Sequence, residues 1–89
     1  MENIKEIRVS AKTNVKMLAS SIIYSIEEGY TVKAVSIGEA IRTLTFAIAL
    51  INTAEEKTYD IDISLKIEYV KTSTGIKDAI VWYLKKKEN

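Results

Sequence analysis

Glycine and proline, the residues that most often interrupt helices and strands, are scarce in this chain of 89 residues, which has three glycines and no proline. Gly38 is the most informative glycine, because it joins a strand-like run at residues 32–37 directly to a long apolar helical pattern that begins at Glu39. An earlier strand pattern at residues 7–11 passes through residues 12–14 into another helical pattern in the same way. Two tight strand-to-helix junctions in succession predict two βα units, whose helix N-termini lie along one edge of the sheet.

Length and composition predict a single globular domain over residues 1–89. At 10.0 kDa the chain has room for one core. Its 47% hydrophobic and 28% charged residues are ordinary for a folded domain. The chain has no cysteine and no histidine, so we expect no metal site and no cofactor. We find no secretory segment, and the longest apolar run, residues 46–51, is short, so we expect a cytoplasmic protein without a membrane partner.

Helical periodicity is clear in two segments. Apolar residues from Val15 to Ile26 fall on one helical face and predict a first helix. Thr13 or Asn14 can cap its N-terminus, and Gly29 is placed to end it in a left-handed conformation. A second helix is predicted from about residue 39 to residue 54.

Strand patterns complete the fold class. A strand is predicted over residues 30–37, and strict alternation over residues 59–69 predicts a longer one with one face buried. The turn-forming residues 72–75 lead to a fourth strand over residues 79–84, antiparallel to the third, and residues 85–89 are expected to form a frayed tail. The order βαβαββ predicts a two-layer α/β sandwich, with a mixed four-stranded sheet and two helices on one face.

The second helix is apolar around more of its circumference than a two-layer fold requires. It could lie wedged between the sheet and the first helix, with Phe46 half exposed. The alternative is a subunit interface of a two-fold homodimer, formed by Phe46 and Leu50 and extended by Trp82, although a lone tryptophan in a domain of this size is more often a core residue.

Charge placement is more informative than the net charge of +1. If the first three strands share one direction, the edge at their C-terminal ends collects five cations, Lys12, Lys16, Arg42, Lys71 and Lys77, against Glu39 and Asp78. Both helix N-termini lie at the same edge, where the helix macrodipole favours anions. This edge suits a phosphate backbone. The alternative is that these charges are ordinary solvated loop residues.

Three stretches of the chain resemble a known family. Residues 9–13 and 18–22, and residues 32–41 continuing to 47–49, are similar to the bacterial stage V sporulation protein S family, which has Alba-like architecture. The resemblance covers about residues 7–52 and implies a βαβαββ fold, a tendency to dimerise and a nucleic-acid-binding role in regulating development. In Alba-like proteins the first βα junction and the C-terminal hairpin meet nucleic acid. Those regions correspond here to Lys12, Thr13, Asn14 and Lys16, and to Lys71–Lys77, which includes Thr72 and Ser73.

Catalysis has little support in the sequence. The serines have no histidine to activate them, and Asp60 and Asp62 lie on one strand face without a further ligand at metal-binding spacing. Gly38 alone does not make a phosphate-binding loop. We therefore expect a protein that is not an enzyme and has no small-molecule substrate.

Two functions remain. The first is binding of DNA or RNA by a small homodimer, with phosphate contacts from the basic edge. The second is a protein-interaction or scaffold module, in which the apolar second helix binds a different protein and the basic edge is incidental.

Overall fold

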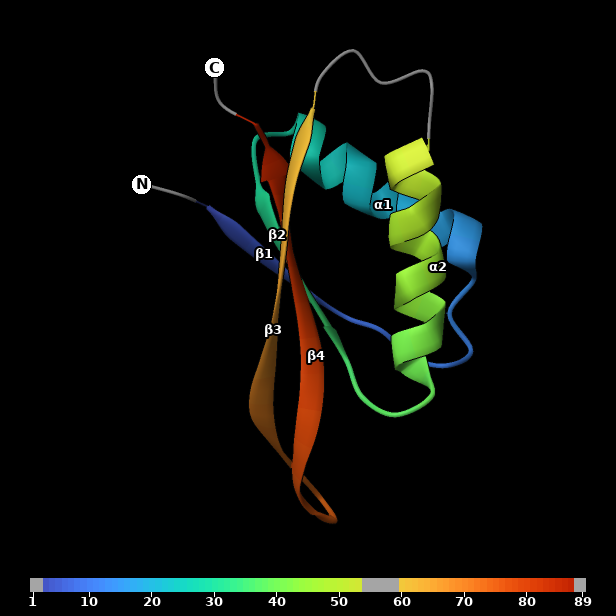
Figure 1. The fold of residues 1–89 in the computed structure, drawn as a ribbon, viewed down its shortest axis with the longest axis vertical. Helices are drawn as coiled ribbons and strands as arrows, with labels where there is room; N and C mark the ends of the chain where they lie inside the picture. The colour runs from blue at the N-terminus through green and yellow to red at the C-terminus, as the bar shows by residue number, and fades with distance from the viewer. Residues whose placement is uncertain (1–2, 54–59, 88–89) are drawn as a thin grey trace.

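The fold is a βαβαββ sandwich in a computed structural model that describes residues 3–53 and 60–87. Its elements are β1 (Ile4–Arg8), α1 (Val15–Glu27), β2 (Thr31–Ser36), α2 (Ala40–Thr53), β3 (Ile61–Thr72) and β4 (Gly75–Lys86). The four strands form one sheet in the order β1-β2-β4-β3, in which β1 and β2 are parallel and β4 is antiparallel to both of its neighbours. Both helices lie on the same side of the sheet (Figure 1). The predicted fold class is confirmed.

Local signals set both ends of α1. The Asn14 side-chain oxygen accepts a hydrogen bond from the Met17 backbone N–H at 3.0 Å, so Asn14 is the N-cap. Gly29, with a φ of 95°, follows the C-cap residue Glu28 and donates its N–H to the Ile26 carbonyl. A positive φ is readily adopted only by glycine, which explains why the helix ends where the sequence predicts.

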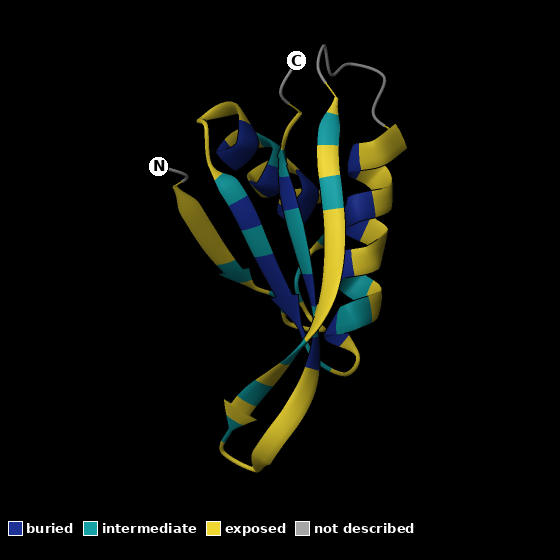
Figure 2. Cartoon of the chain, turned by 60° about the vertical axis from the view of Figure 1, so that its left-hand side comes forward, coloured by how far each residue is buried: buried dark blue, intermediate teal, exposed yellow. Residues whose placement is uncertain are grey.

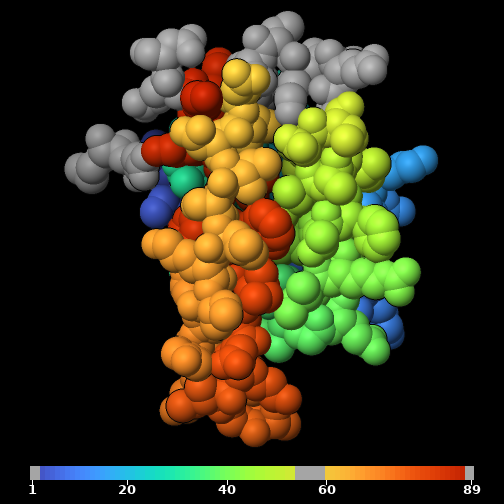
Figure 3. Space-filling view, in the orientation of Figure 1, coloured from blue at the N-terminus to red at the C-terminus, as the bar shows by residue number. Residues whose placement is uncertain are grey.

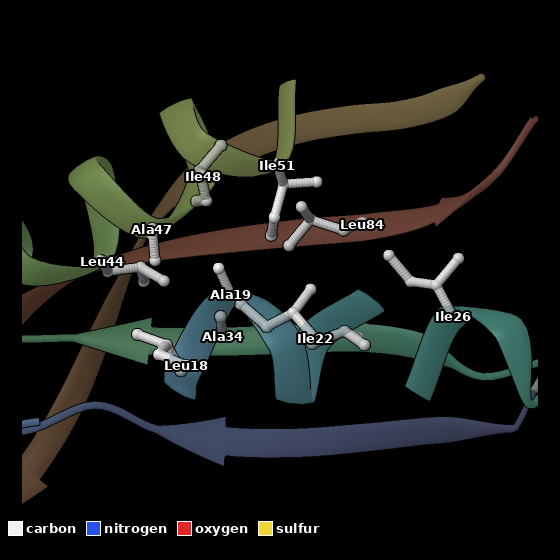
Figure 4. Packing of buried hydrophobic residues seen from close by; sticks show 11 residues of the cluster. Leu18, Ala19, Ile22, Ile26, Ala34, Leu44, Ala47, Ile48, Ile51 and Leu84 are labelled. Atoms are coloured by element: carbon white, nitrogen blue, oxygen red, sulfur yellow. The ribbon is translucent and has the colours of Figure 1, made fainter. Parts of the chain in front are cut away.

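The main core lies between the helices and the sheet. Figure 4 shows α1 and α2 directing apolar side chains toward one another and toward β2 and β4. The largest fully buried side chains of this core are Ile22, Ile26, Leu44, Ile51 and Leu84. α2 therefore packs against both α1 and the sheet, as the first of the two explanations for its wide apolar surface requires.

The first strand lies earlier in the chain than predicted. It spans Ile4–Arg8 rather than residues 7–11, although the Val9 N–H still donates to the Val35 carbonyl beyond its end. The chain then turns, because the Thr13 N–H donates to the Ser10 carbonyl at 3.1 Å. A turn closed in this way cannot continue a strand.

The last strand is longer than predicted at both ends. β4 begins at Gly75 rather than Ala79, because a two-residue turn lets Gly75 pair directly with Thr72. The frayed tail expected from Lys85 is wrong for Lys85 and Lys86, which belong to β4 and pair with β3. The predicted helix end at residue 54 and strand start at residue 59 lie outside the described residues, as do residues 88–89.

Polar side chains cover a small second core on the sheet face opposite the helices. Val81 and Ala79 are fully buried there, beside Val35. Above them the Tyr83 hydroxyl donates to a Glu68 carboxylate oxygen at 2.6 Å, and the Lys33 ammonium lies 3.3 Å from the other Glu68 oxygen. These long side chains shield the apolar residues beneath them with their methylene groups and ring.

The same contacts shift three pKa values. The hydrogen bond from Tyr83, together with the hydrogen bond and charge of Lys33, lowers the pKa of Glu68 below its ordinary value of 4.5. The hydrogen bond to Glu68 raises the pKa of both Tyr83 and Lys33. We refer to Lys33, Glu68 and Tyr83 as the open-face network.

The core analysis predicts that Ile22→Ala destabilises the protein by about 3 kcal/mol, because removal of a fully buried branched side chain leaves a cavity between the helices. Urea denaturation followed by circular dichroism measures the change. Met17→Ala is the control, because Met17 lies on the same helix with 72% of its surface exposed. Equal losses from both variants would contradict the assigned core.

The open-face network predicts the pH dependence of stability. Because folding lowers the pKa of Glu68, its contribution is present above the unfolded pKa and is lost as pH falls through the folded value below 4.5. Tyr83 and Lys33 have raised pKa values, so their contributions are lost only as pH rises above about 10. Glu68→Gln should therefore be less stable than wild type at pH 7, and the difference should shrink below about pH 4. Denaturation curves at several pH values measure this, with Glu39→Gln as an exposed control; a constant difference from pH 3 to pH 8 would contradict the network's role.

Candidate nucleic-acid interface

Local hydrogen bonds shape the junction between β1 and α1. The Ser10 N–H donates to the Thr13 hydroxyl at 3.1 Å, and the Lys12 N–H donates to the Ser10 hydroxyl at 3.0 Å. The oxygens of Thr13 and Asn14 therefore serve this turn and the helix cap. Lys12 and Lys16 are exposed beside them. Within this junction the two lysines carry the charge that a ligand could contact, while Thr13 and Asn14 position it.

A contact between distant segments brings the start of α2 to this junction. The Thr43 hydroxyl, in the first turn of α2, donates to the Ala11 carbonyl at 3.3 Å. Exposed Arg42 precedes Thr43, and its guanidinium lies 5.5 Å from the centre of the Phe46 ring. The structure thus joins the segments that carry Lys12, Lys16 and Arg42, which we name the loop patch.

The other predicted cations lie at the tip of the β3–β4 hairpin. The Thr72 hydroxyl donates to the Gly75 carbonyl at 2.7 Å and accepts from the Thr74 N–H, so Thr72 holds the turn together. Lys71, Ser73 and Lys77 are exposed around it and form the hairpin patch. Figures 1 and 3 show that the hairpin projects past the ends of both helices, and Figure 2 shows that most of its outer half is exposed.

The loop patch and the hairpin patch share one end of the molecule. Because β4 is antiparallel to both β2 and β3, strands β1, β2 and β3 run in one direction, as the charge prediction assumed. The hairpin tip nevertheless stands away from the helix N-termini (Figure 1). The predicted basic edge therefore consists of two patches, and its role in binding stays a prediction.

All five predicted cations are available for an external anion. Within residues 3–53 and 60–87, none of Lys12, Lys16, Arg42, Lys71 and Lys77 forms an ion pair with another side chain. In contrast, Arg8 and Lys33 are both paired with Glu6 at 3.3 and 3.6 Å. A phosphate can approach the five cations without breaking an internal salt bridge.

Arg8 is a surface cation that sequence reasoning missed. It lines a hollow of about 360 Å³ on the open sheet face, together with Lys33 and Lys71 and the carboxylates Glu6 and Glu68. The available signal was the alternation of charged and apolar residues. It places Glu6 and Arg8 on the face opposite Ile7, and Lys33 on the face opposite Val32 and Ala34. The carboxylates offset the cations of this hollow, so it is less suited to an anion than the two patches.

The predicted dimer residues fall in different environments. Phe46 and Leu50 are 53% and 43% exposed on α2. Trp82 is half-buried and packs against the main core, and its buried indole N–H finds no acceptor in the described part of the chain. Phe46 and Leu50 thus remain candidates for an interface, whereas Trp82 belongs mainly to the protomer's own packing.

Two kinds of feature are absent from the described residues. Across residues 3–53 and 60–87, no group of three histidine, cysteine, aspartate or glutamate residues is arranged to hold a metal ion. No helix in the same residues is long and apolar enough to cross a membrane.

Comparison with known proteins supports the fold. No protein-family model matches the chain, and no curated protein matches it. Among solved structures, Alba from Thermoplasma volcanium is similar with a TM-score of 0.58, at 11% sequence identity, over 94% of this chain and 100% of that one. At this identity the likeness shows the fold alone, and the narrower resemblance to the sporulation family stays a prediction. The chain has an Alba-like α/β fold over nearly its whole length.

Proposed function

We propose that this protein binds nucleic acid without catalysing a reaction, as a cytoplasmic homodimer that contacts the phosphate backbone through the loop patch and the hairpin patch. One observation carries the proposal: five exposed cations that form no ion pair within residues 3–53 and 60–87 lie at the edge where strands β1, β2 and β3 end. The resemblance of residues 7–52 to the stage V sporulation protein S family supports it and suggests a regulatory role in sporulation or development.

Long-range electrostatics would orient the protein as it approaches a nucleic acid. Lysine and arginine at one end attract a polyanion, and exposed Glu27 and Glu28 at the other end of α1 repel it. Contacts to phosphate fix position without reading bases. We therefore expect only a modest preference for particular base sequences. The affinities for duplex DNA, single-stranded DNA and RNA should be measured side by side.

Salt dependence tests the phosphate contacts. If one protomer of the dimer contacts duplex DNA, its five cations predict that log K falls with log salt with a slope of about −4.5, at about −0.9 for each contact. Lys12→Glu together with Lys16→Glu should weaken binding to every sequence and reduce the slope to about −2.7. Fluorescence anisotropy titrations at several salt concentrations measure both quantities.

The control carries the same change of charge at the opposite end of the molecule. Lys86→Glu with Lys87→Glu alters exposed residues at the C-terminal end of β4 and should change the affinity much less. Equal losses from the two double variants would show that net charge, rather than a site, governs binding. Absence of binding to any nucleic acid at about 50 mM salt would reject the proposed function.

Dimerisation is the second part of the proposal. Phe46 and Leu50 expose large apolar surfaces on α2, and burial of such surfaces drives association. Phe46→Glu or Leu50→Glu should raise the dimer dissociation constant by roughly 30-fold, because either places a charge in an apolar contact. Sedimentation equilibrium measures the shift, with Met17→Glu on α1 as a control; wild-type protein that sediments as a monomer at tens of micromolar would contradict the dimer.

The exposed apolar surface of α2 also favours a second candidate, a module that binds a different protein. Phe46, with Arg42 stacked on its ring, would then anchor that partner. A monomeric protein that binds no nucleic acid would favour this function over the first.

A further inference from the structure

β3 is an edge strand with an unusual combination of length and exposure. It has 12 residues, and β4 is its only strand partner in the described part of the chain. The Lys87 N–H donates to the Asp60 carbonyl at 2.9 Å, in the same register as the rest of the β3–β4 ladder. Backbone groups alternate in an antiparallel ladder, so the even-numbered residues of β3 bond to β4. The odd-numbered residues 61–71 therefore point their N–H and C=O groups outward, where another strand could pair with them.

The same odd-numbered residues carry apolar side chains on the helix side of the sheet. Leu65, Ile67 and Tyr69 are 53%, 66% and 78% exposed. Ile76, opposite Lys71 near the hairpin tip, is on the same side and 74% exposed. A strand that paired with the outer edge of β3 would cover this apolar row as well as its backbone groups.

Charges on the other side of β3 disfavour several registers for pairing with a second copy of the chain. A two-fold axis at Leu65 would place Asp62 opposite the partner's Glu68. Axes at Lys66 and Glu68 would place each of these residues opposite its own copy. An axis at Ser64 pairs Asp62 with the partner's Lys66, but it leaves Tyr69 beyond the paired segment. Like charges directly opposite one another destabilise a sheet, so the axes at Leu65, Lys66 and Glu68 are disfavoured.

An axis at Ile67 places no like charges opposite one another. Lys66 then faces the partner's Glu68 on both sides of the axis, Leu65 faces the partner's Tyr69, and Ile67 faces its own copy. We propose that two copies of this chain associate by antiparallel pairing of their β3 strands, centred on Ile67, to form one continuous eight-stranded sheet. This inference rests on the homodimer of the proposed function and specifies its interface.

The pairing also fits the position of α2. α2 lies alongside β3 in Figure 3, and the beginning of β3, at Ile61 and Ile63, packs against the core that α2 helps to form. In the proposed register Ile63 faces the partner's Lys71, so the partner's hairpin tip lies beside the beginning of β3, next to the part of the sheet that α2 covers. Exposed surface on α2 can thus join the same interface.

A cysteine substitution tests the position of the axis, because the native chain has no cysteine. Cα atoms in a hydrogen-bonded antiparallel pair are about 5.5 Å apart, within the range that a disulfide spans. Ile67→Cys should therefore convert most of the protein into a disulfide-linked dimer under mild oxidation. Leu65→Cys is the matched control, because Leu65 is exposed on the same face but lies opposite the partner's Tyr69 and not its own copy. Non-reducing electrophoresis and mass spectrometry measure the yield.

The outcomes separate this inference from the proposed function. Cross-linking of Ile67→Cys well above that of Leu65→Cys supports the Ile67 axis. Equal or absent cross-linking, while sedimentation still shows a dimer, would overturn β3 pairing and leave the homodimer in place. Monomeric wild-type protein would overturn both, whereas nucleic-acid binding is judged by its own titration.

Charge exchange provides a second test that does not require a cysteine. Lys66→Glu and Glu68→Lys each place like charges opposite one another in a homodimer, so each should raise the dissociation constant by about tenfold. Mixing the two variants should restore association, because Glu at 66 of one copy would face Lys at 68 of the other, and the reverse pair would also be attractive. Circular dichroism verifies that both variants are folded. Failure of folded variants to associate on mixing, or homodimers as tight as wild type, would reject the register.

Discussion

The insertion of β4 between β2 and β3 is the constraint on which the rest of this structure depends. It holds the sheet together across a long separation in sequence, with Ala34 opposite Trp82 and the Ser36 hydroxyl bonded to the Ile80 carbonyl at 2.9 Å. Because β4 is antiparallel to both neighbours, β1, β2 and β3 all point one way. Both helix N-termini and the hairpin tip therefore follow the C-terminal ends of these strands, although the tip projects away from the helices (Figure 1). The same insertion leaves β3 at the edge of the sheet.

One face of the sheet is covered by helices and the other is covered by its own side chains. On the helix side, α1 and α2 bury the larger core around Ile22 and Leu44. On the other side, the open-face network closes over Val81 and Ala79. A charged and hydrogen-bonded cover keeps this face polar without exposing the small apolar cluster beneath it. Cations there are balanced by carboxylates, whereas those at the two patches are not.

The sequence predicted most of the fold but only part of the site. The apolar spacing of α1, the stop at Gly29 and the alternation in β3 come from local physics, so they could be predicted from single segments. The order of strands in the sheet could not, because it depends on which strand β4 pairs with. Two contacts join residues far apart in the chain and leave no periodic signal in the sequence. They are the hydrogen bond from Thr43 to Ala11 and the salt bridge between Lys33 and Glu68. Alternation around Ile7 placed Arg8 on one face of a strand, but its position beside the hollow depends on the neighbouring strands.

The outer part of the β3–β4 hairpin has a separate consequence. From Lys71 to Asp78 none of its residues is fully buried, and its order comes from its own ladder and the Thr72 turn. Adding or removing one pair of residues on each strand would preserve the alternation of faces and leave the main core untouched. The hairpin can therefore lengthen or shorten during evolution almost independently of the domain that carries it. Its length would set how far the hairpin patch stands from the loop patch, and so the width of surface that the two patches span.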